Sequence, residues 1–185
     1  AAGVRNSLRR KPMVILVGES RDADTIDAMI LAAQTGHLVY TTAHTNSVPE
    51  TLTRLVEPFP VSEREGRLAG LLDSLRLIVT QRLVRTVDGR RAAAREYLHF
   101  TQAEKDRLAE APFRQVARIA RELVRQKGRP LTLDLHALHD AGRLSDTEFH
   151  HYREVGTQLD PLGGVAITRC ADPSDPADHG DPHDG

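Results

Sequence analysis

The chain opens with two short apolar runs on either side of a helix-like segment. Met13–Val17 is uncharged and rich in β-branched residues, which is typical of a strand buried in a parallel sheet with both faces covered. Leu38–Ala43 is a second such run. Asp22 or Asp24 is the expected N-cap of the helix between them, and Gly36 stands where a helix-ending glycine belongs. Apolar residues of that helix share one face: Ile26, Met29, Ile30 and Ala33.

These three segments have the order and the length, about 30 residues, of a βαβ unit. A strand that returns to its sheet through one crossover helix runs parallel to the strand before it. The pattern therefore predicts that the two strands are parallel neighbours.

The next part of the chain predicts two helices and a β-hairpin. Ser47-Val-Pro-Glu50 has the spacing of a capping box and opens the first helix. Residues 62–74 have a second helical pattern. Two extended runs, 75–85 and 91–100, flank Asp88-Gly89, the dipeptide typical of a tight hairpin turn.

The rest of the chain has helical patterns followed by a tail. The expected helices are one after the capping box that begins at Thr101, then 113–127, 132–141 and 146–156. The sequence thus predicts an α/β part over 1–100 and a helical subdomain over 101–156. It also predicts a disordered tail over 157–185, since the last residues are rich in Asp and Pro.

Composition excludes several classes of protein. Lys and Arg total 25 and Asp and Glu total 26, which gives a net charge of −1. A balance this close to zero produces no overall attraction to nucleic acid or to an anionic membrane. A single cysteine, Cys170, permits neither an internal disulfide nor a thiolate metal cluster. No apolar run reaches the roughly 20 residues of a membrane span.

Polar side chains follow both early strands at the point where each strand ends. Glu19 comes just after the first strand and His44 just after the second. Ligands of open α/β sheets bind beyond the carboxyl ends of parallel strands, so both groups are expected at one edge. An acid in this place can orient and deprotonate a water near Mg²⁺ in a nucleotide hydrolase. The alternative is that Glu19 has no catalytic role, because acidic residues commonly follow apolar strands.

His37 has a structural explanation as well as a functional one. Next to Gly36 at a helix end, it can bond the last helical carbonyls. A zinc pair with His44 is disfavoured, because a gap of seven along a strand puts the two side chains on opposite faces and roughly 20 Å apart.

Several blocks of sequence resemble one family. In order they are VRNSLRRKP, VILVGESRD, AAQTGHLVYTTAHTNS, ETLTRLVEPFP and LRLIVTQRLVRTVDGR. They resemble the secretion ATPases of type II and type IV systems, the PilT-like branch of the P-loop NTPases. Within the family, the sequence of these blocks resembles most the subgroup that serves conjugation and Dot/Icm-like type IVB secretion. The resemblance, from about Val4 to Gly142, implies part of a RecA-like domain followed by a helical C-terminal region.

The resemblance also implies roles for particular residues. Glu19 matches the acidic residue of the family's Walker B strand, which acts at Mg²⁺ and at the hydrolytic water. His44 matches a catalytic histidine of the family's His box. ATP and Mg²⁺ are the implied cofactors. Further residues of these motifs are implied to contact the nucleotide: Gly18, Arg21, Asp22 and His37.

One motif of the family is missing. The 185 residues contain no Gly-x-x-x-x-Gly-Lys-Ser/Thr loop, whose backbone N–H groups and lysine hold the phosphates. We therefore expect the C-terminal half of such an ATPase, with no measurable ATPase activity by itself. The alternative is an inactive truncated ATPase that acts as an interaction module within an oligomer. A sheet without its other half should also expose apolar surface, and so favour oligomerisation or poor solubility.

The resemblance implies further partners and a location. They are a homo-hexamer, secretion or pilus components of the inner membrane, and a cytoplasmic position at the inner membrane face. Direct binding of nucleic acid is not expected, because the basic stretches 5–11, 82–95 and 114–129 are interleaved with acids and lack aromatic stacking partners.

Overall fold

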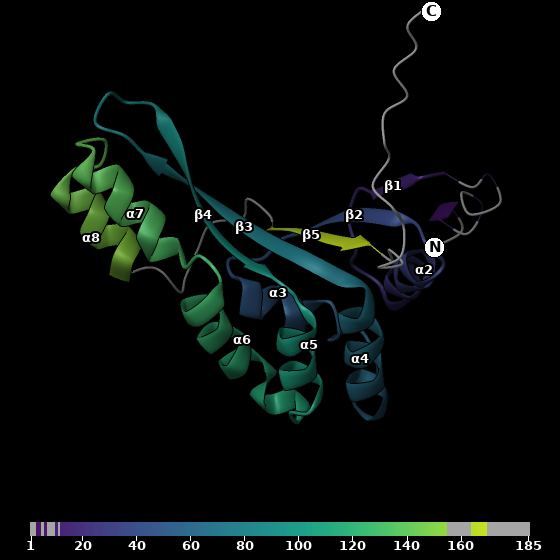
Figure 1. Cartoon of the computed structure of the whole chain (residues 1–185). Helices are drawn as coiled ribbons and strands as arrows, with labels where there is room; N and C mark the ends of the chain where they lie inside the picture. The colour runs from purple at the N-terminus through teal and green to yellow at the C-terminus, as the bar shows by residue number, and fades with distance from the viewer. Residues whose placement is uncertain (1–2, 5, 7–9, 11, 155–163, 170–185) are drawn as a thin grey trace, which may run out of the picture.

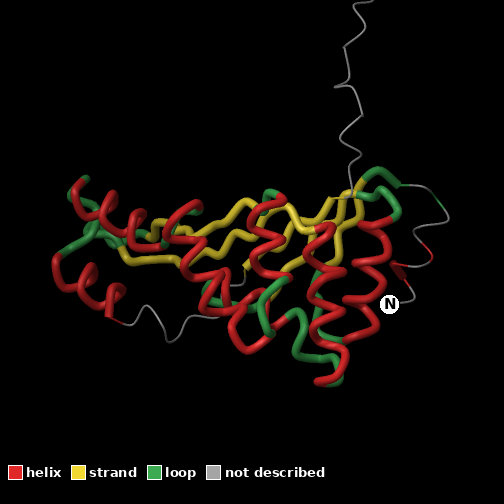
Figure 2. Tube along the Cα trace, turned by 60° about the horizontal axis from the view of Figure 1, so that its bottom comes forward, coloured by secondary structure: helices red, strands yellow, loops and turns green. Residues whose placement is uncertain are grey.

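A five-stranded sheet with helices on one face forms the body of the molecule (Figures 1 and 2). The computed structural model describes residues 3, 4, 6, 10, 12–154 and 164–169. Its strand order is β1-β2-β5-β3-β4. The strands are β1 (Val14–Val17), β2 (Leu38–Ala43), β3 (Leu75–Arg85), β4 (Arg91–His99) and β5 (Gly164–Arg169).

The helices form a layer under the sheet and a separate pair at one end (Figure 1). The layer contains α2 (Ala23–Gln34), α3 (Val48–Arg54), α4 (Arg64–Ser74), α5 (Gln102–Ala109) and α6 (Phe113–Lys127), with the short 3₁₀ turn η1 (Val61–Glu63) before α4. The pair, α7 (Leu131–Asp140) and α8 (Asp146–Glu154), packs at the far end of the β3–β4 hairpin. The helices of this pair correspond to the last two predicted from the sequence.

The predicted βαβ unit is confirmed. β1 pairs in parallel with β2, with Val14 opposite Leu38. The N-cap of α2 is Asp22, whose carboxylate accepts a hydrogen bond from the backbone N–H of Thr25 at 2.8 Å. The helix ends before Gly36, which has a φ of +93° that favours glycine.

The structure corrects the predicted burial of β1. Ile15 and Val17 pack against α2 and β2, as expected. Val14 and Leu16 point to the other face, where they are 51% and 76% exposed. Within the described residues the helices cover only one face of these strands, so the prediction of a strand covered on both faces was wrong.

The structure also corrects the predicted tail. Residues 164–169 of the segment 157–185 form β5, which pairs antiparallel with both β2 and β3. The local sequence Gly-Val-Ala-Ile-Thr-Arg is rich in β-branched residues, which favour strands. β2 and β3 therefore run in the same direction on either side of β5. The other residues of the predicted tail lie outside the described residues.

Two capping predictions have different outcomes. Thr101 and Glu104 form the expected capping box at α5. At α3 the hydroxyl of Ser47 accepts from the backbone N–H of Glu50, but the Glu50 carboxylate accepts from Asn46 rather than from Ser47. Helix α3 is nevertheless capped at its first turn, which begins shortly after the end of β2.

The main core lies between the sheet and the helix layer. Leu52 of α3, Leu72 of α4, Ile78 of β3 and Leu98 of β4 are each at most 1% exposed. Burial of a side chain of this size contributes about 1.5–3 kcal/mol relative to an exposed one. Because α3 is anchored in this core, the residues at its end have a fixed place beside the ends of β1 and β2.

Candidate functional site

The turn after β1 is bonded to the end of β2. The backbone N–H of Ser20 donates to the carbonyl of Thr42 at 3.4 Å, and the Thr42 hydroxyl donates to the carbonyl of Gly18. The hydroxyl of Thr41 donates to the buried hydroxyl of Ser20 at 3.3 Å. These contacts hold Glu19 beside the end of the neighbouring strand.

Glu19 and His44 meet at this edge, as the strand pattern predicted. The Nε2 of His44 lies 3.1 Å from the Oε1 of Glu19, and the guanidinium of Arg21 donates a hydrogen bond to the same oxygen. The hydrogen bond from Arg21 lowers the pKa of Glu19, with further lowering by the charges of Arg21, His44 and Arg54, while partial burial works against it. Glu19 is thus held as a carboxylate among cationic groups.

A cavity of about 570 Å³ opens at this edge. The sequence reasoning did not select two of its residues. Arg54 is the last residue of α3, and Glu57 lies in the turn that follows it. Arg54 lies inside the block ETLTRLVEPFP, which resembles the family, and this position was the one sequence feature that could have led to its selection. A cation in the last turn of a helix is also favourable for the helix itself, so Arg54 has a structural role as well. The lining residues are Glu19, Ser20, Arg21, Ala43, His44, Arg54, Glu57 and Pro58.

Two of the other predicted site residues lie beside the cavity but do not line it. Gly18 is exposed, and a Cβ built on it would meet nothing within 4 Å. Asp22 is occupied as the N-cap of α2, where bonds from the backbone and hydroxyl of Thr25 lower its pKa. A contact of either residue with nucleotide stays a prediction.

His37 is not brought to the cavity. It stands before the first residue of β2, whereas His44 follows the last, so the six-residue strand Leu38–Ala43 separates them. The Nδ1 of His37 lies 3.1 Å from the carbonyl oxygen of Ala32 at the end of α2. The arrangement agrees with the helix-end explanation and leaves the nucleotide role of His37 as a prediction.

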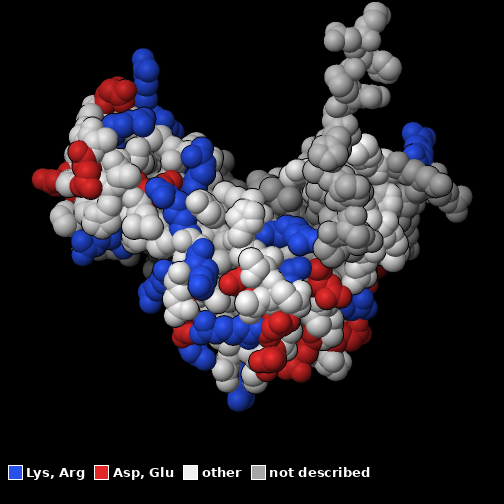
Figure 3. Space-filling model, viewed as in Figure 1, with Lys and Arg blue, Asp and Glu red and all other residues white. Residues whose placement is uncertain are grey.

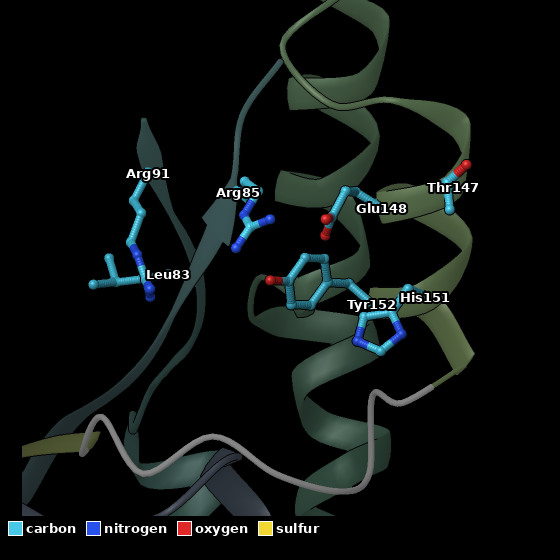
Figure 4. Close-up of a pocket in the computed structure, with 7 residues that line it drawn as sticks. All are labelled: Leu83, Arg85, Arg91, Thr147, Glu148, His151 and Tyr152. Carbon is cyan, nitrogen blue, oxygen red and sulfur yellow. The ribbon is translucent and has the colours of Figure 1, made fainter. Parts of the chain in front are cut away.

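A second hollow lies between the β3–β4 hairpin and α8 (Figure 4). It has a volume of about 440 Å³. Arg85 and Arg91, which stand opposite each other across the hairpin, contribute to it from the strands. None of the six predicted site residues lines it, so it belongs to the helical end of the molecule and not to the Glu19 edge.

The residues that the structure describes offer neither a metal cluster nor a membrane-spanning helix. No group of three or more His, Cys, Asp or Glu side chains in this part of the chain is arranged to hold a metal ion. No helix in the same residues combines the length and the apolarity that crossing a membrane requires.

An acid and a histidine at the carboxyl ends of parallel strands, beside a cavity, place the chain among the α/β proteins that bind ligands at that edge of the sheet. Comparison with known proteins gives the family. Residues 1–158 match the family described as "Type II/IV secretion system protein". The chain belongs to this family, and the resemblance drawn from its sequence blocks is confirmed.

Relatives and solved structures agree with this assignment. Over 107 residues the chain is 40% identical to the type IV pilus retraction ATPase PilT of Pseudomonas aeruginosa, covering 58% of this chain and 31% of that protein. The X-ray structure of the Legionella pneumophila ATPase DotB superimposes with a TM-score of 0.79 at 48% identity, covering 82% of this chain and 41% of DotB. The pilus retraction motor PilT with bound ADP gives 0.72 at 32% identity, over 87% and 44%.

These matches confirm the predicted fold class, which is the α/β fold of RecA-like ATPases. The homologues are ATPases of type IV pilus and secretion systems. The chain spans less than half the length of each of these relatives.

Proposed function

We propose that this chain supplies the water-activating side of an ATP site in a type IV pilus or secretion ATPase. The observation that supports the proposal is the 3.1 Å approach of His44 to Glu19 at the carboxyl ends of two parallel strands. The phosphate-binding loop, which these 185 residues do not contain, would complete the site.

Four residues of the cavity have a chemical task in this proposal. Glu19, kept ionised by Arg21, orients the attacking water and accepts its proton. His44 fixes the position of that carboxylate and faces the transferred phosphoryl group. Arg54 adds positive charge opposite Glu19, which suits the charge that develops on phosphoryl oxygens.

The donor set of the cavity suits Mg²⁺ only in part. Mg²⁺ prefers carboxylate oxygens and keeps several waters, with the nucleotide phosphates as further ligands. Glu19 would hold the ion directly or through a water, and the bound ion would neutralise charge on the phosphates. The remaining protein ligand of the family, the loop hydroxyl, lies outside this sequence.

A chimera tests the proposal. The segment of Pseudomonas aeruginosa PilT that matches this chain over 107 residues is replaced by the corresponding residues of the chain, so that PilT supplies the loop. We expect steady-state ATP hydrolysis that Glu19→Gln lowers on the order of 10²–10⁴-fold, the usual contribution of a general base. Asp24→Asn removes a comparable charge from an exposed position outside the cavity and should leave the rate unchanged.

Each of these expectations has an outcome that would contradict it. A folded chimera that hydrolyses ATP at the same rate with Gln at position 19 would exclude this role of Glu19. The 185-residue chain alone is expected to release no phosphate above background. Phosphate release that Glu19→Gln abolishes would contradict that expectation.

The assembly and the location are part of the same proposal. We infer a hexamer at the cytoplasmic face of the inner membrane, in contact with secretion or pilus components, as the family resemblance implies. The second candidate is an inactive interaction module within an oligomer. Its supporting observation is the uncovered apolar face of β1, where Leu16 is 76% exposed.

A further inference from the structure

The exposed side of α6 has a row of arginines. Arg114, Arg118, Arg121 and Arg125 are all exposed and follow one another at intervals of four, three and four residues. At 3.6 residues per turn and 1.5 Å per residue, this spacing keeps them within about 60° of the helix circumference over about 16 Å. We call these four residues the arginine stripe. Figure 3 shows basic side chains gathered over the part of the molecule where α6 lies.

The stripe has a surplus of positive charge. Arg118 pairs with Glu122 at 2.6 Å, and Arg107 of α5 binds the second oxygen of Glu122 at 2.7 Å. Among the residues that the structure describes, the other three arginines of the stripe form no ion pair. Like charges at these spacings destabilise an isolated helix, and an anionic partner would offset that repulsion.

Other acids near the stripe offset its charge only in part. Glu96 is mostly buried and accepts a hydrogen bond from the backbone N–H of Val48, and the charge of Arg121 also acts on its carboxyl group. Glu110, the C-cap residue of α5, is a single exposed carboxylate four positions before Arg114 in the sequence. The surface therefore fits an extended partner with several carboxylates in a row.

The C-terminal sequence of the chain has this chemistry. Aspartates recur at every third position: Asp172, Asp175, Asp178, Asp181 and Asp184. Three of them are followed directly by proline: Pro173, Pro176 and Pro182. Three residues per turn is the period of the polyproline II helix, which rises about 3.1 Å per residue. In that conformation all five carboxylates share one edge, about 9 Å apart.

The dimensions of the two rows agree. Three successive aspartates span about 19 Å in a polyproline II chain, and the stripe spans about 16 Å. The 16 residues after Arg169 extend to about 50 Å in the same conformation. Their starting point is near the helix layer, since Thr168 stands opposite Leu75, the residue that directly follows α4. The segment can therefore reach α6 of its own chain.

We propose that the aspartate repeat 172–184 docks along the arginine stripe of α6 in the same chain. The contact is electrostatic and exposed, so salt weakens it. No residue of the stripe lines the Glu19 cavity, and the inference stands or falls independently of the proposed ATPase role.

Paramagnetic relaxation tests the contact in the full chain. Cys170 is the only cysteine, so the double variant C170S/A177C accepts one nitroxide in the middle of the repeat. We expect selective loss of the backbone amide signals of α6 in ¹⁵N spectra, with recovery at high salt. The signals should also recover in R114Q/R121Q/R125Q, whose substitutions are exposed, and when all five aspartates are replaced by asparagine.

A matched control separates spacing from charge. A repeat of the same composition with its five aspartates placed consecutively should leave much more of the α6 signal. Loss of signal at other surfaces, or loss that persists in the arginine variant, would overturn the proposal. So would loss seen only when nitroxide-labelled chain is mixed with ¹⁵N chain, because the contact would then join two copies. If the arginine variant fails to fold, the asparagine and consecutive-aspartate variants give the answer by themselves.

Discussion

The Nε2 of His44 lies 3.1 Å from the Oε1 of Glu19, across the ends of two parallel strands. The two residues are 25 positions apart in sequence and meet only because β1 and β2 are parallel neighbours in register. The turn that holds Glu19 is itself bonded to β2 through Ser20 and Thr42. The pairing of the strands is therefore what makes the site.

Arg21 sets the ionisation of Glu19. We expect Arg21→Gln to raise the pKa of Glu19 toward that of an ordinary glutamate, because the hydrogen bond from Arg21 is the largest cause of its lowering. A ¹³C titration of the carboxyl group measures this shift. Arg90→Gln, in the exposed turn of the β3–β4 hairpin and outside the cavity lining, is the control. An unchanged Glu19 pKa in Arg21→Gln would show that the other cations keep the carboxylate ionised.

The same pKa shift has a consequence for stability. A carboxyl group whose folded pKa lies below its unfolded pKa contributes stability above the unfolded value and loses it as the pH falls through the folded value. Wild-type chain should therefore lose this contribution at a lower pH than Arg21→Gln. The shift concerns a partly exposed group, so the difference is small.

Local patterns in the sequence predicted much of this site. Periodicity, a cap and a positive-φ glycine, Gly36, were sufficient to place β1, α2 and β2 in order. The parallel pairing then put Glu19 and His44 at one edge. The hairpin was equally local, since Gly89 has the positive φ that its turn requires.

Long-range contacts explain what the sequence did not reveal. Arg54 and Glu57 line the cavity because the core anchors α3. The sequence around these two residues contains no pattern that predicts this position. β5 pairs with two strands from distant parts of the chain. The exposure of Leu16 depends on which helices cover the sheet, and an apolar run looks the same in either case.

The uncovered face of β1 should promote self-association. We expect Leu16→Thr to reduce it, because Leu16 is 76% exposed and threonine keeps the β propensity of the strand. Sedimentation velocity measures the change, and the urea midpoint should stay the same. Ile15→Thr is the matched variant on the opposite face, where the side chain is 6% exposed. Its free energy of unfolding should fall by about 2 kcal/mol. Equal self-association of Leu16→Thr and wild type would mean that this face stays free of contacts in solution.

His139 links the two helices of the C-terminal pair. Its Nε2 lies 2.7 Å from the carboxylate of Asp146, while its ring stacks on Phe149 with centroids 4.6 Å apart. The hydrogen bond to Asp146 is the main cause of the raised pKa of His139, and it lowers the pKa of Asp146 in return. The stabilisation from His139 is complete below its unfolded pKa and is lost as the pH rises through the folded value. That from Asp146 is lost as the pH falls through its own folded value.

The pair should therefore be strongest between about pH 4 and pH 6.5, the ordinary pKa values of the two groups. Asp146→Asn should lower the pKa of His139, which a titration of the imidazole ¹H shifts reports. Asp140, 3.7 Å from the Nδ1 of His139, provides the comparison, and Asp140→Asn should have the smaller effect. A larger effect of Asp140→Asn would mean that Asp140, and not Asp146, is the main cause of the raised pKa of His139.

Gly128 is required by a close approach of two backbones. A Cβ at this position would lie 2.4 Å from the carbonyl oxygen of Tyr97 and 3.1 Å from the Cα of Val124. The same carbonyl accepts a hydrogen bond from Arg129 at 2.9 Å, so β4 cannot move away without breaking the bridge that ties it to the end of α6. We expect Gly128→Ala to lower the free energy of unfolding by about 1–3 kcal/mol, the usual effect of overpacking.

Gly66 provides the matched substitution for that measurement. It lies inside α4, where an added Cβ would meet nothing within 4 Å. Gly66→Ala should therefore raise the free energy of unfolding by up to about 1 kcal/mol, because alanine favours the helix and reduces the freedom of the unfolded chain. Urea denaturation of both variants measures the two signs together. If Gly128→Ala also stabilised the chain, the contact with Tyr97 would have to be looser than 2.4 Å implies, and α6 would be free to shift against β4.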